Sequence, residues 1–195
     1  NTLVKKKPKS MLININGIPK DGVTAKDIIL HLISKHGANG ANGHAIEFQG
    51  ETIDRMSIES RLTLCNMAVE FGAMTGIISP DKKTIEYISG KAFAPEKGDQ
   101  KLAEEYWASL KSDDGAHFSK IIDIDASKLN TYVTWGTSPE HAIEIKDKIP
   151  SIDDANSSKE NTSIKKALDY MGLEENDAIR GTKIDAAFIG SCTYS

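Results

Sequence analysis

Segments in which every second residue is apolar, as in a strand, alternate along this chain with segments in which apolar residues recur at helical spacing. This alternation restricts the fold more than any other feature. Residues 11–16 alternate between apolar and polar side chains (MLININ) and predict a strand. Thr24 and Asp27 then form a capping-box pattern before apolar residues at helical spacing, and Gly37 predicts the end of that helix. Strands that alternate with helices are typical of α/β layers, so we expect an α/β fold.

The remaining apolar runs extend this pattern. We expect further strands at residues 45–49, 120–125, 132–135 and 184–189, and further helices at residues 58–75, 79–87, 100–111 and 164–171. The run at 184–189 (IDAAFI) is apolar almost throughout, as in a buried parallel strand. The glycine-rich residues 37–43 predict a turn, and the polar residues 151–163 predict a long exposed loop. A polar break at 112–115 (SDDG) suggests a domain boundary, which gives domains at 1–115 and 116–195.

The composition argues against several classes of protein. Of the 195 residues, 39% are hydrophobic, which is too many for an intrinsically disordered chain, and no apolar run reaches the roughly 18 residues of a membrane helix. The net charge of −4 and the scarcity of arginine argue against a nucleic-acid-binding protein. Two cysteines do not make a disulfide framework, so we expect a reducing, cytoplasmic location. The chain begins with Asn1, from which we expect a processed product or a piece of a longer protein.

Asn66, Glu70 and Cys192 are the candidates for chemistry. Asn66 and Glu70 are four positions apart in the most apolar expected helix and so share one face. A buried carboxylate needs a partner, a metal or a raised pKa, so Glu70 is either functional or held in a structural ion pair, for instance with Arg61. Cys192 follows the expected strand at 184–189, at the kind of strand end where α/β sheets gather ligands. Its thiol is a candidate nucleophile or metal ligand, and the alternative is a small buried residue.

The other cysteine, the histidines and the tryptophans show no catalytic or ligand spacing. Cys65 lies among apolar residues and is expected to pack in the core, and Trp107 and Trp135 are also expected to serve packing. The five histidines are expected at surface or capping positions: His31, His36, His44, His117 and His141.

Two segments resemble signatures of the aconitase superfamily. Residues 65–73 (CNMAVEFGA) resemble its CNM-x-x-E-x-GA helix, and residues 188–195 (FIGSCTYS) resemble its FIGSCTNS segment. Residues 133–139 (VTWGTSP) and 22–30 (GVTAKDIIL) are similar to the isopropylmalate dehydratase branch of that superfamily, as are LTLCNMA and ALDYMGL. The resemblance runs in order over essentially the whole chain.

This resemblance implies three-layer α/β/α domains of the aconitase type around a four-iron four-sulfur (4Fe-4S) cluster. The chain would start in the second domain and stop, truncated, in the third. Cys192 matches the first of the family's three cluster ligands, and Asn66 and Glu70 match residues that face the cluster and the substrate. Tyr194 replaces the usual Asn of the signature, which is expected to alter the loop beside Cys192.

The resemblance also implies an activity. The family branch consists of hydro-lyases that isomerise 2-isopropylmalate to 3-isopropylmalate by dehydration and rehydration, in leucine biosynthesis. The implied partners are a small subunit and a small dicarboxylate substrate, with neither nucleic acid nor membrane. Because two cluster ligands, the first-domain residues and the small subunit lie outside this chain, we expect the chain alone to be inactive and to bind no cluster.

Three alternatives to that activity remain open. The chain could derive from a homoaconitase or aconitase-type hydro-lyase, which uses the same chemistry. A cysteine hydrolase would need a histidine close to Cys192, and sequence spacing nominates none. The third alternative is a non-catalytic binding or assembly module.

Overall fold

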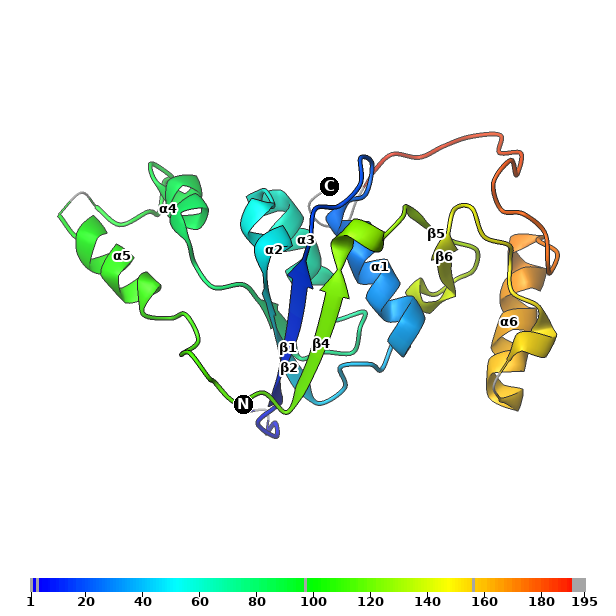
Figure 1. Cartoon of the computed structure of the whole chain (residues 1–195), viewed down its shortest axis with the longest axis horizontal. Coiled ribbons are helices and arrows are strands. Elements are labelled where there is room, and N and C mark those ends of the chain that lie inside the picture. The colour runs from blue at the N-terminus through cyan, green and yellow to red at the C-terminus, as the bar shows by residue number, and fades with distance from the viewer. Residues whose placement is uncertain (1, 3, 97, 156, 191–195) are drawn as a thin grey trace.

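A four-stranded parallel sheet forms the centre of the molecule (Figure 1). The computed structural model describes residues 2, 4–96, 98–155 and 157–190. The strand order is β3–β2–β1–β4, with bounds β1 Lys9–Asn16, β2 His44–Gln49, β3 Thr75–Ile77 and β4 Lys120–Asp125. Two further strands, β5 (Tyr132–Thr134) and β6 (Ala142–Glu144), form a separate antiparallel pair.

Helices flank the sheet and extend the molecule along its long axis (Figure 1). The α-helices are α1 (Ala25–His36), α2 (Glu51–Arg55), α3 (Ile58–Met67), α4 (Lys82–Ile88), α5 (Gln100–Ala108) and α6 (Ser158–Met171). Three short 3₁₀ turns are η1 (Ala126–Lys128), η2 (Pro139–His141) and η3 (Ile152–Asp154). In Figure 1, α4 and α5 lie to one side of the sheet and α6 lies to the other.

The capping box at the start of α1 forms as the sequence predicts. The Asp27 carboxylate accepts hydrogen bonds from the Thr24 backbone N–H and hydroxyl, both at 2.7 Å. Its other oxygen accepts the Tyr132 N–H at 2.6 Å, so Asp27 also ties α1 to β5. A buried carboxylate with three donors keeps its hydrogen-bonding capacity satisfied, and this explains how Asp27 tolerates 5% exposure.

The apolar side chains gather in two clusters. The larger one joins the sheet to α1, α3 and their connections, and its fully buried members include Met11, Ile13 and Ile15 of β1. The smaller one surrounds Trp135 and contains Ile149, Ile164, Ala167 and Leu168. Trp135 is therefore a packing residue, as predicted.

Phe71 locks the glycine-rich turn of residues 37–43 to the larger cluster. Its side chain is fully buried, and a Cβ added to Gly40 would lie 2.1 Å from its ring. The Ala41 N–H also donates to the Phe71 carbonyl at 3.0 Å. The turn thus ends the helix as predicted, and the aromatic ring of Phe71, from a distant segment, packs against it.

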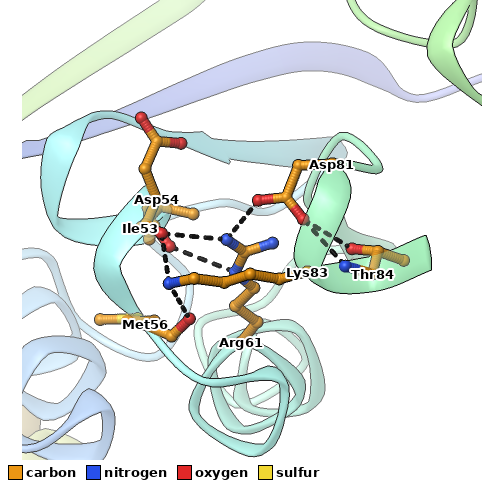
Figure 2. Close-up of polar contacts among 7 residues, drawn as sticks. All are labelled: Ile53, Asp54, Met56, Arg61, Asp81, Lys83 and Thr84. Atoms are coloured by element: carbon orange, nitrogen blue, oxygen red, sulfur yellow. Dashed lines mark hydrogen bonds and ion pairs between the residues drawn. The ribbon is translucent and has the colours of Figure 1, made fainter. Parts of the chain in front are cut away.

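Arg61 ties α3 to its two neighbouring helices through a buried guanidinium (Figure 2). Its Nε donates to the Ile53 carbonyl at 3.2 Å and its Nη2 donates to the Asp54 carbonyl at 3.3 Å, both in α2. The same Nη2 lies 2.6 Å from the Asp81 carboxylate, which caps α4 by accepting the Thr84 N–H at 3.0 Å. One guanidinium therefore connects α3 to α2 through hydrogen bonds and to the start of α4 through an ion pair.

A second cation supports the same junction. Lys83 of α4 donates to the carbonyls of Asp54 at 2.6 Å and Met56 at 3.2 Å, as Figure 2 shows. The end of α2 leaves carbonyls without helical partners, and Arg61 and Lys83 satisfy them. Arg61 Nη1 has no hydrogen-bond partner among the described residues, so the network is incompletely satisfied.

The α/β class is confirmed, and most of the expected elements lie where the sequence predicts. The strands expected at 11–16, 45–49 and 120–125 correspond to β1, β2 and β4, and the one at 132–135 corresponds to β5. The helices expected at 79–87, 100–111 and 164–171 correspond to α4, α5 and the second half of α6.

Three expectations about secondary structure are wrong. The helix expected at 58–75 ends at Met67 and is followed by a turn and β3. The loop expected at 151–163 contains η3 and the first part of α6, which begins where Ser157 accepts a hydrogen bond from the Glu160 N–H at 3.2 Å. The strand expected at 184–189 does not form, because no strand of the described chain pairs with it, and Ile184, Phe188 and Ile189 are exposed.

The sheet continues past the position where we expect a domain boundary. Strand β4 lies beyond residue 115, yet it pairs in parallel with β1 over six residue pairs, from Met11 with Lys120 to Asn16 with Asp125. Residues on both sides of the expected boundary therefore share one sheet. The division into 1–115 and 116–195 as aconitase-type domains stays a prediction.

Gly40→Ala is expected to destabilise the chain by about 1–3 kcal/mol, because the new methyl group would overlap the buried Phe71 ring. Gly98→Ala is the matched control, since a Cβ there meets nothing within 4 Å. Urea unfolding followed by circular dichroism measures both free energies. Equal unfolding midpoints for the two variants would contradict the packing of Phe71 against Gly40.

Asp81→Asn is expected to lower the free energy of unfolding by about 1–2 kcal/mol at pH 7. This is less than for a fully buried ion pair, because the carboxylate is about one third exposed to solvent. The hydrogen bond from Arg61 is the main cause that lowers the pKa of Asp81 from 3.8 to about 2. A lowered pKa adds stability above the unfolded-state pKa, and this stability is lost as the pH falls through the folded-state pKa.

The difference in unfolding free energy between the wild type and Asp81→Asn should therefore shrink as the pH is lowered from about 4 to 2. Asp99→Asn is the control, because Asp99 occupies the N-cap of α5 but its side chain accepts no capping hydrogen bond. A pH-independent difference for Asp81→Asn would show that the charge of Asp81 does not stabilise the junction.

Candidate functional site

The candidate site is the turn that follows α3 and carries Glu70. Leu64, Ala68 and Phe71 are fully buried, whereas Val69 and Glu70, which lie between Ala68 and Phe71, are exposed. Backbone hydrogen bonds close the turn, from Phe71 N–H to the Met67 carbonyl at 3.3 Å and from Ala73 N–H to the Ala68 carbonyl at 3.0 Å. Because the residues on either side are anchored in the core, the turn presents Glu70 to the outside in a fixed position.

Two glycines allow this turn to lie close to its neighbours. Gly72 has a φ of +91°, which favours glycine, and a Cβ there would lie 2.7 Å from the Ala38 carbonyl oxygen. A Cβ on Gly76 would lie 2.8 Å from the Ala68 Cβ and 3.0 Å from the Cys65 Cα. The glycines in this segment therefore serve the close approach of the turn to the 37–43 loop and of β3 to α3.

Asn66 lies in the last turn of α3 and is half-buried. Glu70 is beyond the end of the helix and is exposed. The expectation that Glu70 is a buried carboxylate in the most apolar helix is therefore wrong, and of the residues of α3 only Arg61 and Leu64 are buried. An exposed carboxylate carries little desolvation cost, so burial does not itself argue that Glu70 is functional.

The structural alternative for Glu70, an ion pair with Arg61, is not formed. Arg61 pairs with Asp81 instead. Cys192, like Tyr194 beside it, lies outside the described residues. The site assignments of Asn66, Glu70 and Cys192 thus remain predictions.

Cys65 packs at the edge of the larger cluster, as predicted for a core cysteine. Burial raises the pKa of its thiol to about 11, so the thiolate is scarce at neutral pH. The thiolate is the form that attacks electrophiles, so Cys65 is poorly suited to act as a nucleophile.

We expect His141 at a surface or capping position, but the structure buries its side chain. It is 7% exposed, and its ring stacks on Trp135 with the centroids 4.7 Å apart. Burial lowers its pKa and so favours the neutral ring. His31 is also constrained, because its Nδ1 lies 2.7 Å from the Tyr132 hydroxyl.

A groove of about 680 Å³ lies between α1, the β5–β6 pair and α6. His141, Glu144 and Ser163 are among the residues that line it, and neither Asn66 nor Glu70 does. This groove is therefore separate from the turn that carries the predicted site residues.

Within the ranges that the structure describes, no three or more His, Cys, Asp or Glu side chains are arranged to hold a metal ion. The same ranges contain no helix with both the length and the apolar content needed to cross a bilayer.

Comparison with known proteins gives the family. Two 3-isopropylmalate dehydratase large subunits of Campylobacter jejuni subsp. jejuni, from serotype O:6 (strain 81116 / NCTC 11828) and serotype O:23/36 (strain 81-176), are each 48% identical to this chain over 192 residues. These alignments cover 98% of this chain and 41% of each relative, so the chain spans less than half the length of these curated proteins. Residues 1–195 match the aconitase family (aconitate hydratase), and the chain therefore belongs to that family.

Proposed function

We propose that this chain is part of a hydro-lyase that interconverts 2-isopropylmalate and 3-isopropylmalate by removing and adding water. The names of the relatives at 48% identity support this substrate class. The term "large subunit" in those names supports a small subunit as the partner. On this proposal the enzyme serves leucine biosynthesis in the cytoplasm.

The observation that carries the proposal is the outward turn at residues 68–71, whose two end residues are buried. A catalytic carboxylate must reach its substrate, and it must be held in place to do so. Glu70 meets the first condition because it is exposed, and the buried Ala68 and Phe71 on either side meet the second. Asn66 lies four positions earlier, in the last turn of α3, and we propose that its amide acts together with the Glu70 side chain.

We assign Glu70 the movement of a proton at the substrate oxygen that is lost as water and returned. Its carboxylate would take up the proton in one direction and donate it in the other. The Asn66 side-chain amide can donate and accept a hydrogen bond, so it would orient the same oxygen.

The described residues do not by themselves form a site for the iron–sulfur cluster of the family. Such clusters are held by several thiolates, whereas this chain has two cysteines, and Cys65 packs against the larger core cluster, which leaves Cys192 as the proposed ligand. We propose that Cys192 is a single ligand of a four-iron four-sulfur cluster whose other ligands come from outside this chain. The cluster, when bound, would supply a Lewis acid for the removal of the hydroxyl group.

The isolated 195-residue chain is expected to bind no cluster and to be inactive, because one thiolate cannot hold a cluster that needs several. Iron and sulfide analysis, together with the visible absorption spectrum of anaerobically reconstituted protein, measures cluster binding. A stoichiometric cluster in the isolated chain would contradict the assignment of Cys192 as a single ligand.

Glu70→Gln in the two-subunit enzyme that carries this sequence is expected to lower kcat by about a hundredfold or more, because the amide cannot transfer the proton. Iron content should stay unchanged, since Cys192 is intact. The matched control is Glu105→Gln on the outer surface of α5, where the side chain is 65% exposed, and this variant should keep normal turnover.

Two outcomes would count against this function. Normal turnover of 2-isopropylmalate by Glu70→Gln would remove the catalytic assignment. Preferred turnover of a homoaconitate or citrate substrate by the unmodified enzyme would replace isopropylmalate with another substrate of the same chemistry.

A further inference from the structure

Three asparagine–glycine pairs occur in this chain, and the structure holds them in different ways. They are Asn16–Gly17, Asn39–Gly40 and Asn42–Gly43, and the last two lie in the glycine-rich turn of residues 37–43. In such a pair the glycine nitrogen can attack the side-chain amide of the asparagine, because glycine has no Cβ to block the approach. The attack needs a free glycine N–H, a backbone that can shift and an asparagine side chain that can rotate.

Contacts within the fold restrain the first two pairs. The Asn16 side-chain oxygen accepts the Glu51 N–H at 3.0 Å, which fixes this side chain at the start of α2. The Gly40 N–H donates to the Gly37 carbonyl at 3.1 Å, and Gly40 also lies directly against the Phe71 ring. Either pair must therefore break a native contact before it can react.

The Asn42–Gly43 pair lacks these restraints. Both residues are exposed, and a Cβ on Gly43 would meet nothing within 4 Å. Within the described part of the chain, neither the Gly43 N–H nor the Asn42 side-chain amide has a hydrogen-bond partner. The nitrogen that attacks and the carbon that is attacked are thus both free to approach one another.

His44 makes the Gly43 N–H more acidic. The His44 Nδ1 lies 2.9 Å from the backbone carbonyl oxygen of Asn42, and because a carbonyl only accepts, the ring nitrogen is the donor. This carbonyl belongs to the same amide group as the Gly43 nitrogen. A hydrogen bond to the amide oxygen stabilises the anion that forms when the nitrogen loses its proton.

We propose that Asn42 is a deamidation site that reacts ahead of the other two pairs, and that His44 promotes the reaction. This proposal is independent of the hydro-lyase function. The Gly43 nitrogen gives its proton to solvent and forms a bond to the Asn42 Cγ. The bond from Cγ to Nδ2 breaks, and that nitrogen takes a proton from solvent and leaves as ammonia. Water then opens the five-membered imide to aspartate or isoaspartate, and no oxidant or reductant takes part.

The position of Asn42 connects this reaction to the candidate site. The Ala41 N–H donates to the Phe71 carbonyl at 3.0 Å, and the His44 carbonyl accepts the Met74 N–H at 2.8 Å. These two bonds flank the turn of the candidate site, and Asn42 lies between them along the chain. Isoaspartate adds a methylene group to the backbone between the two bonds, so the modification alters the segment that holds this turn.

Storage of the purified 195-residue chain at mildly alkaline pH, followed by peptide mapping with mass spectrometry, tests the proposal. Asn42 is expected to convert about tenfold faster than Asn16 or Asn39, because each of the other pairs must first break a hydrogen bond. Equal rates at the three positions, or faster conversion at Asn16 or Asn39, would overturn the proposal.

The same chain unfolded in urea is the control for local sequence. The three pairs should then convert at similar rates, since the contacts of the fold are lost. A preference for Asn42 that persists in urea would show that the fold does not select the site, and this result would also overturn the proposal.

His44→Ala in the folded chain tests the part assigned to the imidazole. Conversion of Asn42 is expected to slow about threefold, because the donor to the amide oxygen is lost. His117→Ala is the matched control, because it removes an exposed imidazole outside the segment that contains Asn42. An unchanged rate in a His44→Ala chain that keeps its circular dichroism spectrum would overturn the role of His44.

Discussion

The described fold depends on β1, which has partners on both edges and supplies the centre of the core. It pairs in parallel with β2 on one side and with β4 on the other. Its fully buried Met11, Ile13 and Ile15 belong to the same cluster as the apolar face of α1. Parallel sheets need burial to be stable, and β1 meets this requirement. The other strands take their positions from it, including β2, whose far edge holds β3.

The candidate site depends on this core through two non-local contacts. The Phe71 ring packs against Gly40, and this contact holds the turn that carries Glu70 against the core. The Arg61–Asp81 pair fixes the first half of α3 against α2 and α4. Both contacts join residues that are distant in sequence, and neither involves the side chains of Asn66 or Glu70. These two contacts position the site, and either can be altered by mutation without changing the proposed catalytic groups.

Local signals in the sequence predicted much of this fold. The Thr24–Asp27 capping box and Gly37 gave the limits of α1, because both act within a single turn of backbone. The sequence failed where the outcome depends on distant partners or on the direction of a side chain. Residues 184–189, for example, are apolar but have no strand beside them in the described chain. The start of α6 is a different kind of failure, because the Ser157 cap is a local signal that lies inside a polar stretch resembling a loop. For the site, the motif nominates Asn66, Glu70 and Cys192, which stays a prediction, and it could not reveal that α3 ends before Glu70 or that Arg61 pairs with Asp81.

The position of β4 beside β1 has a consequence for how the chain folds during synthesis. The hydrogen bond between Ser119 and Ser10, where the two strands begin to pair, spans 109 residues. At roughly 5–20 residues per second, a ribosome would complete β4 about 5–20 s after β1. Strand β2 can pair with β1 early, but the other edge of β1 stays open during that interval. An open apolar edge can pair with another chain, so slow translation of residues 50–120 would favour aggregation unless that edge is shielded.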